Sequence, residues 1–269
     1  MSFIQLALLL GILTALFLAI GFFFAGFAGM TIGLVIALLT NLIAYWYSDS
    51  FVLRLYRAKP YENKKLRLMI DKLAKKHDIP KPKLYFVDTD VPNAFATGRS
   101  PKHSAVAVTR GLIDKLNDGE VEAVLAHELS HVKHRDTLVS TMAATIGGAI
   151  TWLAYMFWFG SDENRNIISY LLLFILAPLA AMMIRLSITR SREYLADRGG
   201  AQIADPLKLA SALEKISESV KSNPMRGNAS ASHLFIVNPF AAGNLAHLFS
   251  THPRTEERVK RLKAIAYAE

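Results

Sequence analysis

Four long apolar runs constrain this chain more than any other feature of its sequence. They cover residues 3–24, 30–47, 138–159 and 167–186. An α-helix of about 20 apolar residues crosses a hydrocarbon core about 30 Å thick, so each run is long enough to span a membrane. We therefore predict two transmembrane hairpins, one at the start of the chain and one that interrupts its polar part.

Each hairpin has an alternative interpretation. A cleaved signal peptide is the alternative for run 3–24, but no Lys or Arg precedes this run and a second apolar run follows closely. The second hairpin contains the small-residue stretch TMAATIGGAI, so it could instead be a buried helical pair packed against protein. We assign helix-packing roles to Thr40, Asn41 and Pro178 within the runs.

The basic residues predict the orientation of the hairpins. All 31 Lys and Arg, apart from Arg165 and Arg185, lie in residues 48–137 or after residue 186. By the positive-inside rule both polar segments and both termini face the cytoplasm. A formal net charge of +9 suggests nucleic acid in a soluble protein, but these charges lie beside the spans, where anionic lipid head groups explain them. We therefore predict a lipid bilayer and no nucleic acid as a partner.

The polar segments predict a mixed fold. Residues 61–77 have helical spacing, and the β-prone stretches KLYFV, NAFAT and SAVAV follow as an expected antiparallel meander. A capping box of Asn117 and Glu120 begins the next helix, which we expect to run at least to Asp136. We predict a mobile loop over residues 223–250 and a final amphipathic helix from about Pro253. The fold class is thus α+β and predominantly helical, with a small antiparallel sheet.

The stretch HELSH lies on the helix that the capping box begins. Because His127 and His131 are four residues apart, they lie on one face of a helix and can bind one ion. Glu128 points about a quarter-turn away, which puts its carboxylate beside such an ion, within reach of a water molecule. The chain has no cysteine, so a metal site here must use histidines and carboxylates.

A third ligand must come from elsewhere in the chain. His134 is on the same face, but it lies about 10 Å from His127 along the helix, too far for one zinc. We predict Glu193 as the third ligand and Asp197 as the carboxylate that accepts a hydrogen bond from a ligating histidine. The alternative for the stretch SREYLAD is an ordinary helix whose carboxylates pair with nearby arginines.

Four motifs resemble those of a known family. The stretches NAFATG, AVLAHELSH, SREYLADRGGA and THPRTEERVKRL, in this order around membrane hairpins, resemble the HtpX-type membrane proteases of bacteria. HExxH followed by Glu-x-x-x-Asp is similar to the gluzincin metallopeptidases, and the CAAX prenyl endopeptidases are relatives. The middle two motifs are the most specific, and the resemblance covers nearly the whole chain.

This resemblance implies a zinc endopeptidase in the bacterial cytoplasmic membrane that cleaves unfolded or damaged membrane proteins. It implies one Zn²⁺ per chain on His127, His131 and Glu193, with Glu128 as the catalytic carboxylate. The peptidase domain would combine residues 48–137 and 187–269, separated by the hairpin 138–186 and preceded by the hairpin 1–47. The oligomeric state stays open.

Further site residues follow from the expected peptidase chemistry. The family's His-Pro element matches His252 and Pro253, and we predict His252, then Arg258, as donors to the charge that grows on the scissile carbonyl oxygen. The alternatives are a helix-start histidine and an arginine on a solvated face. If NAFAT is the sheet edge nearest the metal, a peptide could add to it as a strand, with Asn93 and Phe95 contacting substrate. The alternative is an interior strand.

Two other functions compete with this prediction. One is a protease that cuts within the bilayer, but charged residues flank HELSH and argue against an intramembrane helix. The other is a zinc-dependent membrane scaffold, which would not need Glu128. Only about 10 Å of helix separates His131 from the third apolar run, so we expect the site to lie near the head groups.

Overall fold

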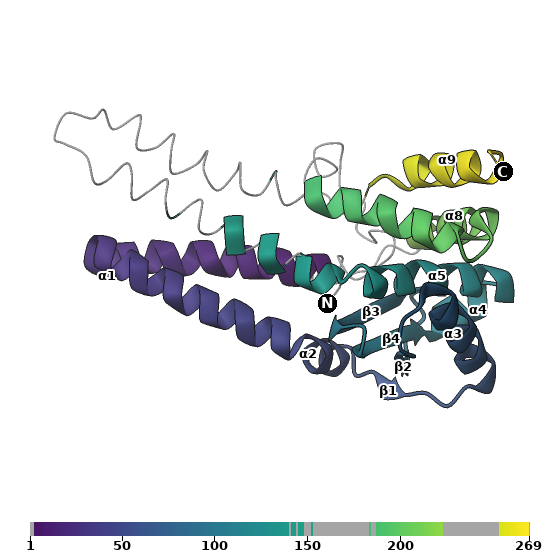
Figure 1. Cartoon of the computed structure of the whole chain (residues 1–269), viewed down its shortest axis with the longest axis horizontal. Coiled ribbons are helices and arrows are strands. Elements are labelled where there is room, and N and C mark those ends of the chain that lie inside the picture. Colours follow the sequence, from purple (N-terminus) through teal and green to yellow (C-terminus); the bar gives the residue numbers. More distant parts are fainter. Residues whose placement is uncertain are drawn as a thin grey trace. The chain divides into compact units, whose positions relative to one another are not determined.

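The structure is a computed structural model that describes residues 3–139, 141–143, 145–147, 152, 183, 187–222 and 253–268. It forms two compact units (Figure 1). The apolar unit comprises Gln5–Trp46 and Val139–Ile188, and the polar unit comprises Met1–Ile4, Tyr47–Leu138 and Thr189–Glu269. The elements are α1 (Phe3–Trp46), α2 (Ser48–Leu55), β1 (Lys59–Pro60), α3 (Lys64–His77), β2 (Lys83–Val87), β3 (Ala94–Ser100), β4 (His103–Thr109), α4 (Arg110–Lys115), α5 (Asp118–Lys133), α8 (Pro206–Ser222) and α9 (Thr255–Ala266).

In the apolar unit, α1 consists of two helical arms separated by a break at Ala25 and Gly26. Gly26 has a φ of 54°, which glycine adopts without steric cost and which ends the first arm. The arms pack through small residues, because a Cβ atom on Gly21 would overlap the carbonyl of Gly29. Asn41 joins them by donating a hydrogen bond to Thr14, in agreement with the packing role predicted for Asn41.

Among the described residues, the stretch Thr14–Ile43 of α1 is long and apolar enough to cross a membrane by length and composition, and it includes the break at Ala25 and Gly26; the mean hydropathy of an 18-residue window within it is 2.3. Most residues of the runs 138–159 and 167–186 lie outside the described residues, as do Pro178 and the predicted loop from 223 to 250. The four predicted spans therefore stay a prediction.

The sheet of the polar unit differs from the predicted antiparallel meander. Its strand order is β1-β2-β4-β3, with β2 parallel to β4 and the other two pairs antiparallel. The meander was wrong because β3 does not pair with β2, although it follows β2 in sequence. After β2 the chain skips one strand position to form β3 at the edge of the sheet, and β4 then fills the position between β2 and β3. β4 is buried along nearly its whole length, as a central strand should be, so the apolar run SAVAV was the signal for its position.

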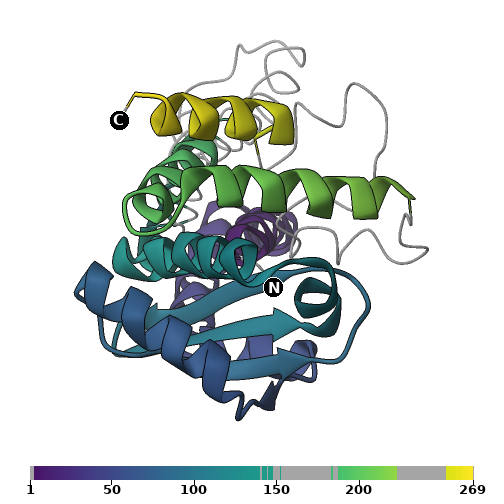
Figure 2. The same cartoon turned by 90° about the vertical axis from the view of Figure 1, so that its right-hand side faces the viewer.

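The helices around the sheet follow their sequence signals more closely. Asn63 caps α3, and Asn117 and Glu120 form the predicted capping box at the start of α5. α5 packs between the sheet and α8, and α9 lies on the other side of α8 (Figure 2). α9 begins at Thr255, which confirms the predicted final helix. α5, however, ends at Lys133 and not beyond Asp136.

One continuous core joins these layers. It combines residues of α3, the sheet, α5, α8 and α9, among them Ile70, Leu73, Val106, Val108, Leu125, Leu129, Leu213 and Leu262. Glu120 ties α5 to α8, because its buried carboxylate accepts hydrogen bonds from Ser211 and Lys215. Burial alone would raise the pKa of Glu120, but these two bonds and the Asn117 amide lower it. α5 is therefore held on both sides.

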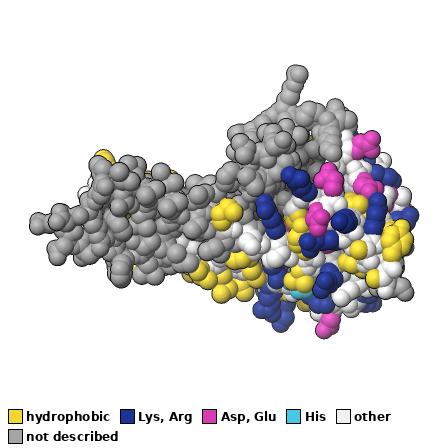
Figure 3. Space-filling model, turned by 90° about the horizontal axis from the view of Figure 1, so that it is seen from above, with side chains coloured by type: hydrophobic (Ala, Val, Ile, Leu, Met, Phe, Trp, Pro, Cys, Tyr) yellow, Lys and Arg dark blue, Asp and Glu magenta, His cyan; other side chains and the backbone are white. Residues whose placement is uncertain are grey.

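Charges on the surface of the polar unit are mixed. On the face in Figure 3, Lys and Arg side chains lie among Asp and Glu side chains, with small groups of hydrophobic side chains between them. Several of these charges form exposed ion pairs, such as Arg110 with Asp88 and Asp90.

Candidate metal centre

Two helices bring three potential metal ligands together. On α5 the Nε2 atoms of His127 and His131 lie 3.2 Å apart. The Glu193 carboxylate reaches both from the Glu193 helix, which we define as the helical residues 187–201. Its oxygens lie 3.9 Å from Nε2 of His127 and 3.6 Å from Nε2 of His131. These are the three residues that the sequence predicted as ligands.

The donor set fits zinc. Four ligand atoms at about 2.0–2.1 Å from a tetrahedral zinc lie roughly 3.3 Å from one another. The three side chains offer two imidazole nitrogens and one carboxylate oxygen at separations near this value, all within 4.8 Å. His127 and Glu193 are buried and His131 is half-buried. Three protein ligands leave a fourth position for water or substrate, which is typical of catalytic zinc sites.

A pair of glycines lets the Glu193 helix approach α5 closely. A Cβ atom on Gly199 would lie 2.6 Å from Oγ of Ser130, and one on Gly200 would lie 3.1 Å from the backbone nitrogen of His127. Such contacts are shorter than normal van der Waals contacts. The stretch DRGGA after the third ligand is therefore a packing requirement for bringing the carboxylate to the histidines.

Glu128 lies beside the three ligands and contacts the sheet. Its Oε2 atom accepts a hydrogen bond of 2.9 Å from the backbone N–H of Ala96 in β3. Burial raises the pKa of Glu128, and the charge of Glu193 raises it further, against the opposing effect of the two histidines. A buried carboxylate with a raised pKa next to a metal site has the properties of a general base.

His127 has a carboxylate behind it, as the sequence predicted. Oδ1 of Asp197 lies 3.0 Å from Nδ1 of His127, whereas Glu193 approaches Nε2 of the same ring. Burial would raise the pKa of Asp197, but Arg258 and His127 lower it to about 2. Asp197 is therefore charged at neutral pH and can hold the imidazole in the orientation that presents Nε2.

Arg258 is buried in the site and not on the solvated face that was its alternative. It is 1% exposed, and its guanidinium donates two hydrogen bonds of 2.8 and 2.7 Å to Asp197. Its Nη1 atom lies 3.4 Å from Glu193. Burial lowers the pKa of Arg258, but these carboxylates raise it overall. Its Nη2 atom lies 3.4 Å from Nε2 of His127, so Arg258 contacts Asp197, Glu193 and His127.

The remaining predicted site residues have different outcomes. His252 lies outside the described residues. Asn93 is buried just before β3, where its backbone nitrogen donates to Thr109, and Phe95 is buried against the ring of Tyr56. The residue of β3 that reaches the site is Ala96, through its backbone. A backbone contact has no residue-type signal, so sequence reasoning missed it.

Sequence reasoning also missed Asp136 and Arg192. Nδ1 of His131 lies 2.5 Å from Oδ2 of Asp136, and Arg192 donates to the other oxygen of this carboxylate. Burial would lower the pKa of His131, but Asp136 and Glu193 raise it to about 9. His134 is half-buried after the end of α5 and is not among the three clustered ligands, as predicted.

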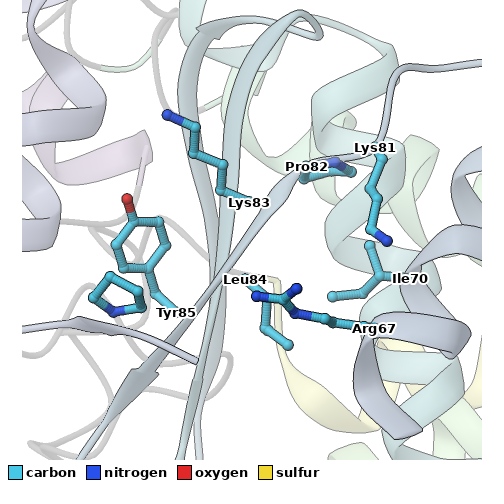
Figure 4. Close-up of a pocket in the computed structure, with 8 residues that line it drawn as sticks. Arg67, Ile70, Lys81, Pro82, Lys83, Leu84 and Tyr85 are labelled. Atoms are coloured by element: carbon cyan, nitrogen blue, oxygen red, sulfur yellow. The ribbon is translucent and has the colours of Figure 1, made fainter. Parts of the chain in front are cut away.

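A separate pocket of about 410 Å³ lies between α3 and β2 and shares no residue with the metal site (Figure 4). Its lining combines the apolar side chains of Ile70 and Leu84 with basic ones such as Arg67 and Lys81. Arg67 and Lys81 form ion pairs with Glu62 and Asp71. The pocket has none of the groups that the metal site assembles.

Comparisons with known proteins agree with the site. Residues 60–266 match the model of peptidase family M48. The HtpX protease homologues of Pyrococcus abyssi and Pyrococcus furiosus are each 50% identical over 276 residues, covering 98% of this chain and 96% of theirs. The homologue of Persephonella marina is 49% identical over 282 residues, covering 99% of this chain and 98% of its own.

A solved structure shares the fold. The crystal structure of Ste24p from S. mikatae matches with a TM-score of 0.56 at 20% identity. The match covers 92% of this chain and 61% of Ste24p, so the chain spans about three fifths of that protein. The family match, the full-length relatives and the assembled HExxH and Glu193 residues lead to one conclusion. The chain belongs to peptidase family M48, among the HtpX-type metallopeptidases.

Proposed function

We propose that this chain is a membrane-bound zinc endopeptidase that hydrolyses peptide bonds in unfolded or damaged membrane proteins. The observation that carries the proposal is the meeting of His127, His131 and Glu193 with Glu128 at their side. His127, His131 and Glu193 would hold one zinc ion. Bound zinc would supply a Lewis acid for the scissile carbonyl and would lower the pKa of a water molecule to about 7.

The residues of the chain carry the proton transfers. Glu128 would accept a proton from the water whose oxygen attacks the carbonyl carbon, and would deliver it to the amine nitrogen as the C–N bond breaks. The position of Glu128 suits both steps, because its buried carboxylate lies beside the proposed ligands and is held by the N–H of Ala96. His252, then Arg258, stay our candidates for donors to the carbonyl oxygen, and Arg258 would also position Asp197 and Glu193.

Within the described part of the chain β3 is an edge strand of the sheet, which supports binding of an extended peptide. The carbonyl of Asn93 accepts a hydrogen bond from the Thr109 amide, so alternate backbone groups of β3 face β4. The N–H of Ala96 faces the other way, toward Glu128. A substrate added as a strand along this edge would lie beside the proposed base. Binding through the backbone favours unfolded chains of many sequences.

The division of the chain favours cleavage outside the bilayer. All three proposed ligands lie in the polar unit, as do Glu128 and the β3 edge. With the positive-inside rule, this supports an active site that faces the cytoplasm in a multi-pass membrane protein. Cytosolic loops and unfolded segments of damaged membrane proteins would be the substrates within reach.

Removal and return of metal tests the proposed function. The full chain, purified in mild detergent, should cleave casein, should lose this activity when a chelator removes its metal, and should regain it with one equivalent of Zn²⁺. Gel electrophoresis of the casein fragments measures the result. Cleavage that persists in verified metal-free protein, or no cleavage by the fully zinc-loaded chain, would contradict the proposal.

A further inference from the structure

We propose that Asp136 is a positioning residue that orients His131 for metal binding, and that a break in the helix at Arg135 and an ion pair with Arg192 hold it in place. The inference rests on the proposed zinc site and adds to it. His127 already has a carboxylate, Asp197, held by Arg258. The structure gives His131 a second set of the same kind.

Both carboxylate oxygens of Asp136 have a hydrogen-bond partner, and these contacts fix the orientation of its side chain. The carboxylate is buried, at 2% exposed. Its Oδ2 atom lies 2.5 Å from Nδ1 of His131, and its Oδ1 atom accepts from Nε of Arg192 at 2.6 Å. When a bound metal displaces the proton of Nε2, which lies on the side of His127 and Glu193, the remaining proton of the imidazole stays on Nδ1 beside Asp136. Asp136 thus selects the tautomer of His131 that can bind a metal.

The contact between His131 and Asp136 requires a break in the helix. Residues five apart on a straight α-helix lie about 140° apart around the axis and about 7.5 Å apart along it, so their side chains diverge. α5 ends at Lys133, and Arg135 has a φ of 52°, in the left-handed region. Helical structure resumes at Asp136. The turn in between brings the Asp136 carboxylate back to His131.

Arg192 fastens this turn to the other half of the site. Besides binding Asp136, it donates a hydrogen bond of 2.9 Å to the carbonyl of His134, one of the groups left without a helical partner at the end of α5. Arg192 precedes the ligand Glu193 in sequence. The chain leaves the polar unit after Leu138 and returns to it at Thr189. The ion pair between Asp136 and Arg192 therefore joins the segment just before the exit to the segment just after the return.

The contacts of His127 with Asp197 and Arg258 and those of His131 with Asp136 and Arg192 have the same pattern. Each histidine has a buried carboxylate at its Nδ1 atom, and each carboxylate is bound by an arginine from another element. A charged acceptor at Nδ1 raises the basicity of the ligand nitrogen, and loss of such a partner typically weakens metal binding by 10–100-fold. We assign this role at His131 to Asp136.

The first test is Asp136→Asn in the full chain, with the zinc dissociation constant measured by competition with a chelator. We expect zinc binding about 10–100-fold weaker than in the wild type, and an altered visible absorption spectrum of bound Co²⁺. The control Asp71→Asn removes a half-buried carboxylate that pairs with Lys81, away from the metal site, and should bind zinc like the wild type. A purely structural role would lower the folded fraction but leave the Co²⁺ spectrum unchanged.

A second pair of variants leaves every contacting side chain in place. Arg135→Gly allows the positive φ, whereas Arg135→Val disfavours it. We expect wild-type zinc affinity for the glycine variant and several-fold weaker binding for the valine variant. Equal zinc affinities in wild type, Asp136→Asn and Arg135→Val would overturn this inference while leaving the zinc site intact. Failure of the wild type to bind zinc would instead overturn the proposed function.

Discussion

The variant Glu128→Gln is expected to bind zinc like the wild type and to lose peptidase activity by about 10²–10⁴-fold, the usual contribution of a general base. Glutamine keeps the size of the side chain, and its oxygen can still accept the hydrogen bond from the Ala96 amide. It cannot accept a proton from water. Casein cleavage by detergent-purified protein, measured together with the zinc content of the same samples, gives both values.

Glu122→Gln is a matched control for this prediction. Glu122 lies on the same helix, and its carboxylate forms an ion pair with Lys72 on the surface. The control should keep both zinc and activity. Undiminished cleavage by Glu128→Gln would place the base elsewhere, and loss of zinc from this variant would make Glu128 a ligand.

The sequence predicts those residues of the site that are close together in the chain, because their spacing on a helix fixes their relative positions. His127 and His131 are four residues apart on a capped helix, so their convergence follows from helix geometry alone. Glu193 and Asp197 have the same spacing on a second helix, and the need for a third ligand connected that helix to the first before the resemblance to a family supported it. The structure places both carboxylates at the histidines.

The sheet shows why topology was harder to predict. The three expected strands exist, but their order depends on which strand is buried on both faces. The nearly unbroken apolar run of β4 indicates a central strand, whereas pairing of successive strands would give the meander that we predicted. Burial decided the order, and it put β3 at an edge next to Glu128.

The end of α5 depends on contacts that are distant in sequence. Residues 134 and 135 carry no glycine or proline that would signal a break, and Arg135 adopts a positive φ that non-glycine residues seldom adopt. The bonds from Arg192 to Asp136 and to the His134 carbonyl stabilise this turn. A prediction from local propensity therefore placed the end of α5 too late, and it missed Asp136 as a partner of His131.

The variant Glu193→Ala is expected to lower zinc affinity by more than the 10–100-fold that loss of an outer carboxylate costs, because it removes a proposed ligand. It also leaves the buried charge of Arg258 with one carboxylate partner fewer. Chelator competition measures the dissociation constant, and peptidase activity at matched free zinc should fall with occupancy.

Glu214→Ala is the control for Glu193→Ala. Glu214 lies on α8, and its carboxylate forms an exposed ion pair with Lys263. This variant should bind zinc like the wild type. Unchanged zinc affinity in Glu193→Ala would show that another group completes the site, and the assignment of the third ligand would be wrong.

The central claim is that two histidines from one helix and a carboxylate from another hold a single zinc ion. X-ray absorption at the zinc edge, on the full wild-type chain in detergent, tests it most directly. We expect nitrogen and oxygen neighbours at about 2.0–2.1 Å and the outer-shell scattering of two imidazoles. One imidazole, or three with His134 as the additional ligand, would contradict the account.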